Sequence, residues 1–229
     1  MEAQHITSTR KLVDSDEDHR ILEEEIDRLK PPLPMDTEFQ GFHYLLSTPF
    51  RYPPLQHGSR FGTRRERSLW YGSEQLSTVQ AEVAYYRFLF LSGSSAVFDD
   101  SELRLTAFTV PVSSIAGIDL TAHPFSPFGS RISSKTLYTD SQDLGLEMRS
   151  AGVEVSRYYS ARDREDGVNI ALFTPNGFSS KNPLTSQTWI CSSSSSRTEF
   201  SRSDLLSRET RVFDRGDFEV EGKLPAPAF

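Results

Sequence analysis

The chain has 229 residues, of which 25 are Lys or Arg and 32 are Asp or Glu, giving a formal net charge of −7. Hydrophobic residues make up 36%, which suffices for a core and excludes a wholly disordered chain. The acidic balance argues against general nucleic-acid binding, which needs a surplus of Lys and Arg, and the single cysteine, Cys191, excludes a disulfide framework and a cysteine-rich zinc site.

The N-terminal region shows no targeting segment. Met1 to His5 have neither the basic nor the apolar part of a secretory signal, and no run of 18 apolar residues could span a membrane. We therefore expect a reducing, cytoplasmic setting without membrane contact.

Residues 1–30 hold nine acids against five bases. Asp14 or Ser15 fits a helix N-cap, and the acids that follow suit the positive end of a helix dipole. A helix is predicted over about 15–30, ended by the prolines that begin at Pro31, because four apolar residues share one face: Ile21, Leu22, Ile26 and Leu29. We expect a solvated helix docked on the domain edge, in preference to a partner-binding helix.

Short strands and helices are predicted through the middle of the chain. Residues 35–66 are mixed and turn-rich, and Leu69 to Tyr71 form a short apolar strand. Ser77 and Gln80 fit a capping box that begins a helix over about 78–92. One face of that helix is expected to be apolar and carries Ala81, Tyr85, Phe88 and Leu89.

The remaining patterns complete an α+β fold. Alternating polarity predicts a strand over 103–112, and a helix over 141–150 ends near Gly152. Two more strands are predicted over 153–159 and 168–173. The run Ser192 to Ser196 indicates a linker or a mobile loop, and residues 224–229 are expected to be loosely held.

Common catalytic and binding motifs are missing. The chain has no Gly-rich phosphate loop, no dinucleotide-binding glycine motif and no Gly-x-Ser-x-Gly. The five histidines stand at no metal-ligand spacing, so we predict no metal site. Cys191 has no neighbouring base and is interpreted as structural.

What remains is an ordered set of segments that resembles a known family. The set consists of Arg51–Tyr52, Gly58 to Phe61, Tyr71, Thr78 to Glu82, Ser160 and Asn169. In this order the segments resemble the RES domain, a family named for its arginine, glutamate and serine. Residues 1–15 also resemble the leader of a longer subgroup, so the resemblance covers about residues 1–180.

The resemblance implies fold, activity and partner. It implies an ADP-ribosyltransferase-like mixed β-sheet core with short flanking helices. The chain then divides into an N-terminal helical extension (1–35), a RES catalytic domain (36–185) and a polar C-terminal tail (186–229) that packs on or extends the domain. Such proteins split NAD⁺ at the nicotinamide–ribose bond, with NAD⁺ as substrate and no cofactor. They are toxins silenced by a helix-turn-helix, Xre-like antitoxin.

The resemblance also implies the site residues. Catalysis is assigned to Glu82, Arg60, Tyr71 and Ser160. Binding of NAD⁺ is assigned to Arg51, Tyr52, Arg60, Tyr71, Ser160 and Asn169, although a packing role is slightly favoured for Tyr52.

These residue types suit the cleavage of NAD⁺. Arginine forks bind phosphate oxygens, and residues 51–67 form a basic island of net charge +4, with five arginines against one acid. Breaking the glycosidic bond builds positive charge on the ribose, which a carboxylate such as Glu82 can stabilise. Tyr71 can stack on nicotinamide, and Ser160 can bind the ligand or orient Glu82.

Several alternatives stay open on the sequence. Arg64, Arg65 and Arg67 are interpreted as solvated charges, while Arg157 or Arg162 could take a role assigned to another residue. ADP-ribose could pass to water, to phosphate or to a protein, and a non-catalytic interaction module is the competing class. A homodimer or a hetero-oligomer with the antitoxin is expected, with any DNA contact made by the partner.

Overall fold

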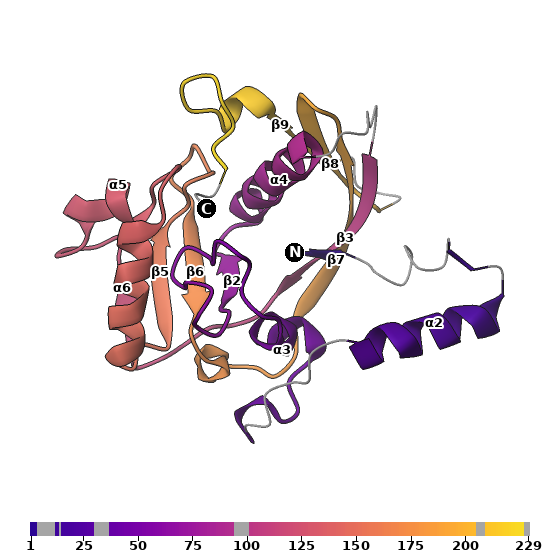
Figure 1. Cartoon of the computed structure of the whole chain (residues 1–229), viewed down its shortest axis with the longest axis horizontal. Helices are drawn as coiled ribbons and strands as arrows, with labels where there is room; N and C mark the ends of the chain where they lie inside the picture. Colours follow the sequence, from indigo (N-terminus) through magenta and orange to yellow (C-terminus); the bar gives the residue numbers. More distant parts are fainter. Residues whose placement is uncertain (4–11, 14, 30–36, 94–100, 205–208, 227–229) are drawn as a thin grey trace.

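The computed structural model describes residues 1–3, 12–13, 15–29, 37–93, 101–204 and 209–226. Two β-sheets with short helices around them form an α+β fold, as predicted (Figure 1). The described helices are α2 (Asp16–Leu29), α3 (Tyr44–Arg51), α4 (Leu76–Gly93), α5 (Gly129–Ile132) and α6 (Thr139–Ser150). Short 3-10 helices are formed by Thr37–Phe39, Ser126–Phe128, Pro175–Gly177 and Arg215–Asp217.

The larger sheet has five antiparallel strands in the order β1-β3-β7-β8-β9. They are β1 (Glu2–Ala3), β3 (Ser101–Thr109), β7 (Thr185–Ser193), β8 (Arg197–Arg202) and β9 (Thr210–Asp214). The smaller sheet has four strands in the order β2-β6-β5-β4, and β4 runs parallel to β5. These are β2 (Trp70–Ser73), β4 (Gly117–Asp119), β5 (Val155–Tyr159) and β6 (Val168–Leu172).

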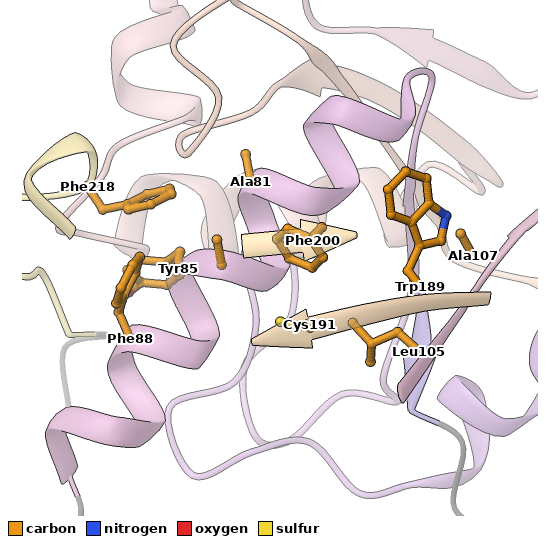
Figure 2. Packing of buried hydrophobic residues seen from close by; sticks show 10 residues of the cluster. Ala81, Tyr85, Phe88, Leu105, Ala107, Trp189, Cys191, Phe200 and Phe218 are labelled. Carbon is orange, nitrogen blue, oxygen red and sulfur yellow. The ribbon is translucent and has the colours of Figure 1, made fainter. Parts of the chain in front are cut away.

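Helix α4 packs across the five-stranded sheet and forms the main core with it (Figure 2). Its buried face repeats at i, i+3, i+4 and i+7 and consists of Ala81, Ala84, Tyr85 and Phe88. Strands β3, β7 and β8 meet this face with Leu105, Ala107, Trp189, Cys191 and Phe200. Cys191 is fully buried in this core, as expected of a structural residue, and burial raises the pKa of its thiol.

The start of α4 differs from the prediction. The helix begins at Leu76, and the Ser77 hydroxyl donates to Oε1 of Gln75 at 3.4 Å. Ser77 therefore lies inside the first turn, and the predicted capping box with Gln80 is wrong.

Strand alternation gives the four-stranded sheet two different faces. Trp70 lies opposite Leu172, whereas Tyr71 lies opposite Ala171, so the two pairs point to opposite sides. Residues of α3 cover the side that carries Trp70. Residues of α6 pack on the side that carries Ala171, and this second side also bears Tyr71.

The predicted N-terminal helix is present as α2, but two of its four apolar residues are exposed. Ile21 and Leu29 are 46% and 84% exposed, and Figure 1 shows α2 apart from both sheets. Pro31, the expected end of the helix, lies outside the described residues. Glu2–Ala3 pair with β3 as β1, so the first residues belong to the sheet and not to a helical extension.

The chain beyond residue 185 is part of the larger sheet. Ser192 and Ser193 end β7, and residues 194–196 turn into β8, where Ser194 N donates to Arg197 O at 2.8 Å. The linker interpretation of the serine run is therefore wrong. Pro225 is also held, since its carbonyl accepts from the Tyr85 hydroxyl at 2.6 Å, so loose attachment is wrong there; residues 227–229 lie outside the described part.

Helix α3 was not predicted within the turn-rich segment 35–66. It is short and contains Pro49, so it offers little helical periodicity to read. Its Leu46 and Phe50 are nonetheless buried against the smaller sheet.

Candidate functional site

A cleft of about 480 Å³ lies between α4 and the Tyr71 side of the four-stranded sheet. The sheet contributes Tyr71 and Ser73 from β2, Asn169 from β6 and Tyr158 from β5. The segment 52–55 and the loop 58–60 line it as well. Strand alternation explains the grouping, because these four sheet residues are mutual neighbours on one face.

Helix α4 contributes its second face to the cleft. The lining residues are Val79, Glu82, Val83 and Tyr86, again spaced i, i+3, i+4 and i+7. This face is turned away from the core face, although Val83 borders both the cleft and the core. Of this face the sequence pointed to Glu82 alone, although the spacings i−3 and i+4 from Glu82 also indicate Val79 and Tyr86.

One oxygen of the Glu82 carboxylate is fixed by two donors. Oε1 accepts from Ser160 Oγ at 2.7 Å and from Asn169 Nδ2 at 2.6 Å. Oε2 accepts no hydrogen bond from any residue that the structure describes. The carboxylate is therefore oriented through one oxygen, and the other is available to a ligand in the cleft.

The orientation of the Asn169 side-chain amide follows from its two hydrogen-bond partners, Glu82 and Ser73. A carboxylate only accepts hydrogen bonds, so Asn169 must turn its amide nitrogen toward Glu82. Its Oδ1 then accepts from Ser73 Oγ at 2.6 Å. A chain of hydrogen bonds thus runs from β2 through β6 to α4.

Ser160 stands behind Glu82 and does not line the cleft. Its hydroxyl donates to Glu82 and accepts from the backbone N–H of Arg162 and Asp163 at 3.0 and 3.1 Å. One donor and two lone pairs are then all used. This geometry favours orientation of Glu82 over direct contact with a ligand.

The turn that carries Ser160 is anchored to α4. Thr78 Oγ1 donates to Asp163 Oδ2 at 2.7 Å, and Ser160 N donates to Gly167 O at 2.7 Å. A Cβ on Gly167 would lie 2.1 Å from Thr78 Oγ1, so the turn approaches the helix as closely as a glycine allows.

Arg60 lines the cleft, but its guanidinium already hydrogen-bonds backbone carbonyls. Its Nη1 and Nη2 each donate at 3.0 Å, to the carbonyls of Ile132 and Ser134. Its guanidinium lies 4.7 Å from the ring centroid of Tyr138, another lining residue, which no motif in the sequence indicated. Arg60 brings positive charge to the cleft and holds the segment 132–134 against it.

Tyr71 is held by the loop that carries Arg60. Its hydroxyl donates to Ser59 Oγ at 2.9 Å and accepts from Phe61 N at 3.2 Å. The loop turns at Gly58, whose φ of +70° suits glycine, and a Cβ there would meet Gly62 O at 2.2 Å.

Most arginines of the basic island (residues 51–67) do not line the cleft. Of its five arginines only Arg60 is a lining residue; Arg51 ends α3 outside the lining set, whereas Tyr52 is part of it. Arg64 and Arg65 are exposed, as expected. Arg67 is not simply solvated, because it pairs with Glu38 at 2.9 Å.

Buried tyrosines near the cleft hold their protons strongly. Burial raises the pKa of Tyr71, raises that of Tyr158 well above its ordinary value, and raises that of Tyr85 to about 12. Above about pH 10 an unfolded chain releases phenol protons that the folded chain keeps. Stability is therefore lost as the pH rises from about 10 toward 12.

We expect urea unfolding to report this loss, with about 1 kcal/mol from Tyr85 alone at about pH 11 relative to pH 8. The variant Tyr85→Phe should show a smaller drop between the two pH values. Tyr44, which is 63% exposed, serves as control, and Tyr44→Phe should keep the wild-type drop. Equal drops in all three proteins would contradict the prediction.

Fold and site together define an α+β protein whose cleft is built around an oriented carboxylate, with cationic and phenolic side chains beside it. The family model of the RES domain matches residues 36–193, and the chain belongs to the RES domain family. The matched range contains every predicted site residue from Arg51 to Asn169 and ends at Ser193, the last residue of β7.

RES domains are known from toxin–antitoxin systems, are associated with antitoxin partners and point to an NAD-related enzymatic function. A search of curated proteins finds no match to the chain. Among the helices that the structure describes, none has the length and apolar character needed to cross a membrane.

Proposed function

We propose that the protein cleaves NAD⁺ at the nicotinamide–ribose bond, with water as the simplest acceptor. The observation that carries the proposal is the carboxylate of Glu82, which is oriented through Oε1 and open at Oε2 in the cleft. A fixed negative charge of this kind stabilises positive charge that develops on a bound ribose.

The reaction balances without a cofactor. The bond between ribose C1′ and the nicotinamide nitrogen breaks, and its electron pair neutralises the pyridinium charge. C1′ passes through an oxocarbenium-like state, water adds its oxygen there, and one proton is released. The products are nicotinamide and ADP-ribose.

The cleft residues take distinct roles in this proposal. Glu82 contacts the ribose and stabilises the developing charge, while Ser160 and Asn169 position Glu82. Arg60 supplies positive charge for the anionic part of NAD⁺, and the ring of Tyr71 offers a surface for nicotinamide.

Incubation of the pure protein with NAD⁺ tests the activity directly. We expect chromatography of the reaction mixture to show nicotinamide and free ADP-ribose in equal amounts. ADP-ribose attached to a protein, or a phosphorylated product in phosphate buffer, would identify a different acceptor. If no nicotinamide is released under any of these conditions, the proposed cleavage is wrong.

Removal of the Ser160 hydroxyl should slow cleavage without removing the cleft. Ser160→Ala deprives Glu82 of one donor and two N–H groups of their acceptor, so we expect kcat to fall by about 10- to 100-fold with KM little changed. Stability should fall by about 1–3 kcal/mol.

The matched control for this variant is Ser156→Ala on the preceding strand. Ser156 is fully buried, and its Oγ has no hydrogen-bond partner within the described residues. Its removal should leave kcat unchanged. A Ser160→Ala enzyme as fast as the Ser156→Ala enzyme would remove Ser160 from the proposed mechanism.

The family context extends the proposal to a toxin acting on the cytoplasmic NAD⁺ pool and restrained by an Xre-like antitoxin. Expression without the antitoxin should deplete cellular NAD⁺ and stop growth, and coexpression should prevent both effects. Undisturbed growth with normal NAD⁺ would argue for a non-catalytic interaction module instead.

A further inference from the structure

Arg162 is a buried cation of the cleft that has no counter-ion among the residues that the structure describes. It lines the cleft and is only 5% exposed, and its Nη1 is buried without a hydrogen-bond partner. Across the described residues its guanidinium makes no hydrogen bond and no ion pair. Because a buried unpaired charge is costly, such a side chain in a cleft indicates a site for an anion.

The neighbours of Arg162 position it but do not neutralise it. Its Cζ lies 3.6 Å from the ring centroid of Tyr85, and its backbone N–H donates to Ser160 Oγ. The pKa of Tyr85 is about 12, chiefly through burial, so this phenol is neutral at physiological pH. Two carboxylates of the same region, Glu82 and Asp163, accept hydrogen bonds from other residues.

Arg162 is better suited to bind an anion than the arginines expected from the sequence. Both terminal nitrogens of Arg60 already donate hydrogen bonds to backbone carbonyls, and Arg51 does not line the cleft. The ring of Tyr85, on which Arg162 stacks, belongs to the residue three positions after Glu82 on α4. Ser160 Oγ also hydrogen-bonds both Oε1 of Glu82, at 2.7 Å, and the backbone N–H of Arg162, at 3.0 Å, so the two residues are adjacent at the cleft.

We propose that Arg162 is the principal anion-binding residue of the cleft and takes the phosphate adjoining the ribose that Glu82 contacts. The diphosphate part of the inference rests on the proposed function. The stack on Tyr85 holds the guanidinium in place, which leaves its donors for phosphate oxygens.

Calorimetric titration with ADP-ribose and, separately, with inorganic pyrophosphate tests the site. Relative to wild type, Arg162→Met should bind both about 10- to 100-fold more weakly, and Arg162→Lys should lie between. Arg164→Met is the matched control, because Arg164 is exposed and paired with Asp217 at 2.7 Å; its affinities should match wild type.

The outcomes separate this inference from the proposed function. The wild-type protein could bind pyrophosphate but not ADP-ribose, and Arg162→Met could lose the binding of pyrophosphate. That result would support the anion site and contradict NAD⁺ as the substrate. Equal affinity of wild type and Arg162→Met for both probes, or no binding of either probe to wild type, would overturn the inference.

Unfolding in urea distinguishes a binding role from a structural one. Without ligand, Arg162→Met should unfold at the same or a higher urea concentration than wild type, because it removes an unpaired buried charge. A lower midpoint, or a variant that does not fold, would show that the guanidinium supports the fold and would overturn the inference.

Discussion

Replacement of Glu82 by Gln is expected to lower kcat for nicotinamide release by about 10²- to 10³-fold, the scale of losing one preorganised electrostatic group. The amide keeps the shape of the side chain and an oxygen that accepts from Ser160. What it loses is the negative charge opposite the developing cation. The fold and the affinity for ADP-ribose should therefore change little.

The control for Glu82→Gln is the same substitution at Glu147, an exposed residue of α6. Both variants should unfold within about 1 kcal/mol of wild type, and Glu147→Gln should release nicotinamide at the wild-type rate. Release by Glu82→Gln at that same rate would exclude the carboxylate from the chemistry.

The largest expected effect on stability comes from Phe88→Ala. Phe88 is fully buried in the core between α4 and the larger sheet, and its ring centroid lies 5.7 Å from that of Phe218 (Figure 2). Truncation leaves a cavity among close-packed side chains, so we expect a loss of about 3–5 kcal/mol in urea unfolding. Because α4 also carries Glu82, activity should fall at temperatures where the variant begins to unfold.

Phe90 offers a matched comparison on the same helix. It is 61% exposed and lies over the Arg87 guanidinium at 5.5 Å, so Phe90→Ala should cost less than about 1 kcal/mol. Similar losses of unfolding free energy in the two variants would contradict the assignment of Phe88 to the buried face of α4 and of Phe90 to its exposed face.

Elements with a clear period were predicted well. Local sequence predicts the apolar face of α4, the alternation along β3 and the strands β5 and β6. Burial on one side of an element imposes a regular repeat of apolar residues, which the sequence displays. Strands β7 to β9 were missed. Their serines and charges hide the alternation, while pairing along the backbone with β3 and packing around Trp189 and Phe200 hold them in the sheet.

For the site, the sequence by itself determined the residue types and their order. Glu82 on a helix and Asn169 on a strand could be assigned locally, and the ordered set identified the family before any contact was known. The basic island, however, suggested that residues 51–67 would hold the anion.

Only the tertiary structure decided which residues meet. Ser160 and Asn169 converge on one oxygen of Glu82 across 78 and 87 positions of sequence, Arg60 turns to backbone carbonyls, and Arg162 enters the cleft from the turn after β5. The physical reason is that local sequence sets the periodicity of an element. The partners of a buried polar group are set by how distant elements pack, which satisfies most buried donors and leaves Arg162 Nη1 without a partner among the described residues.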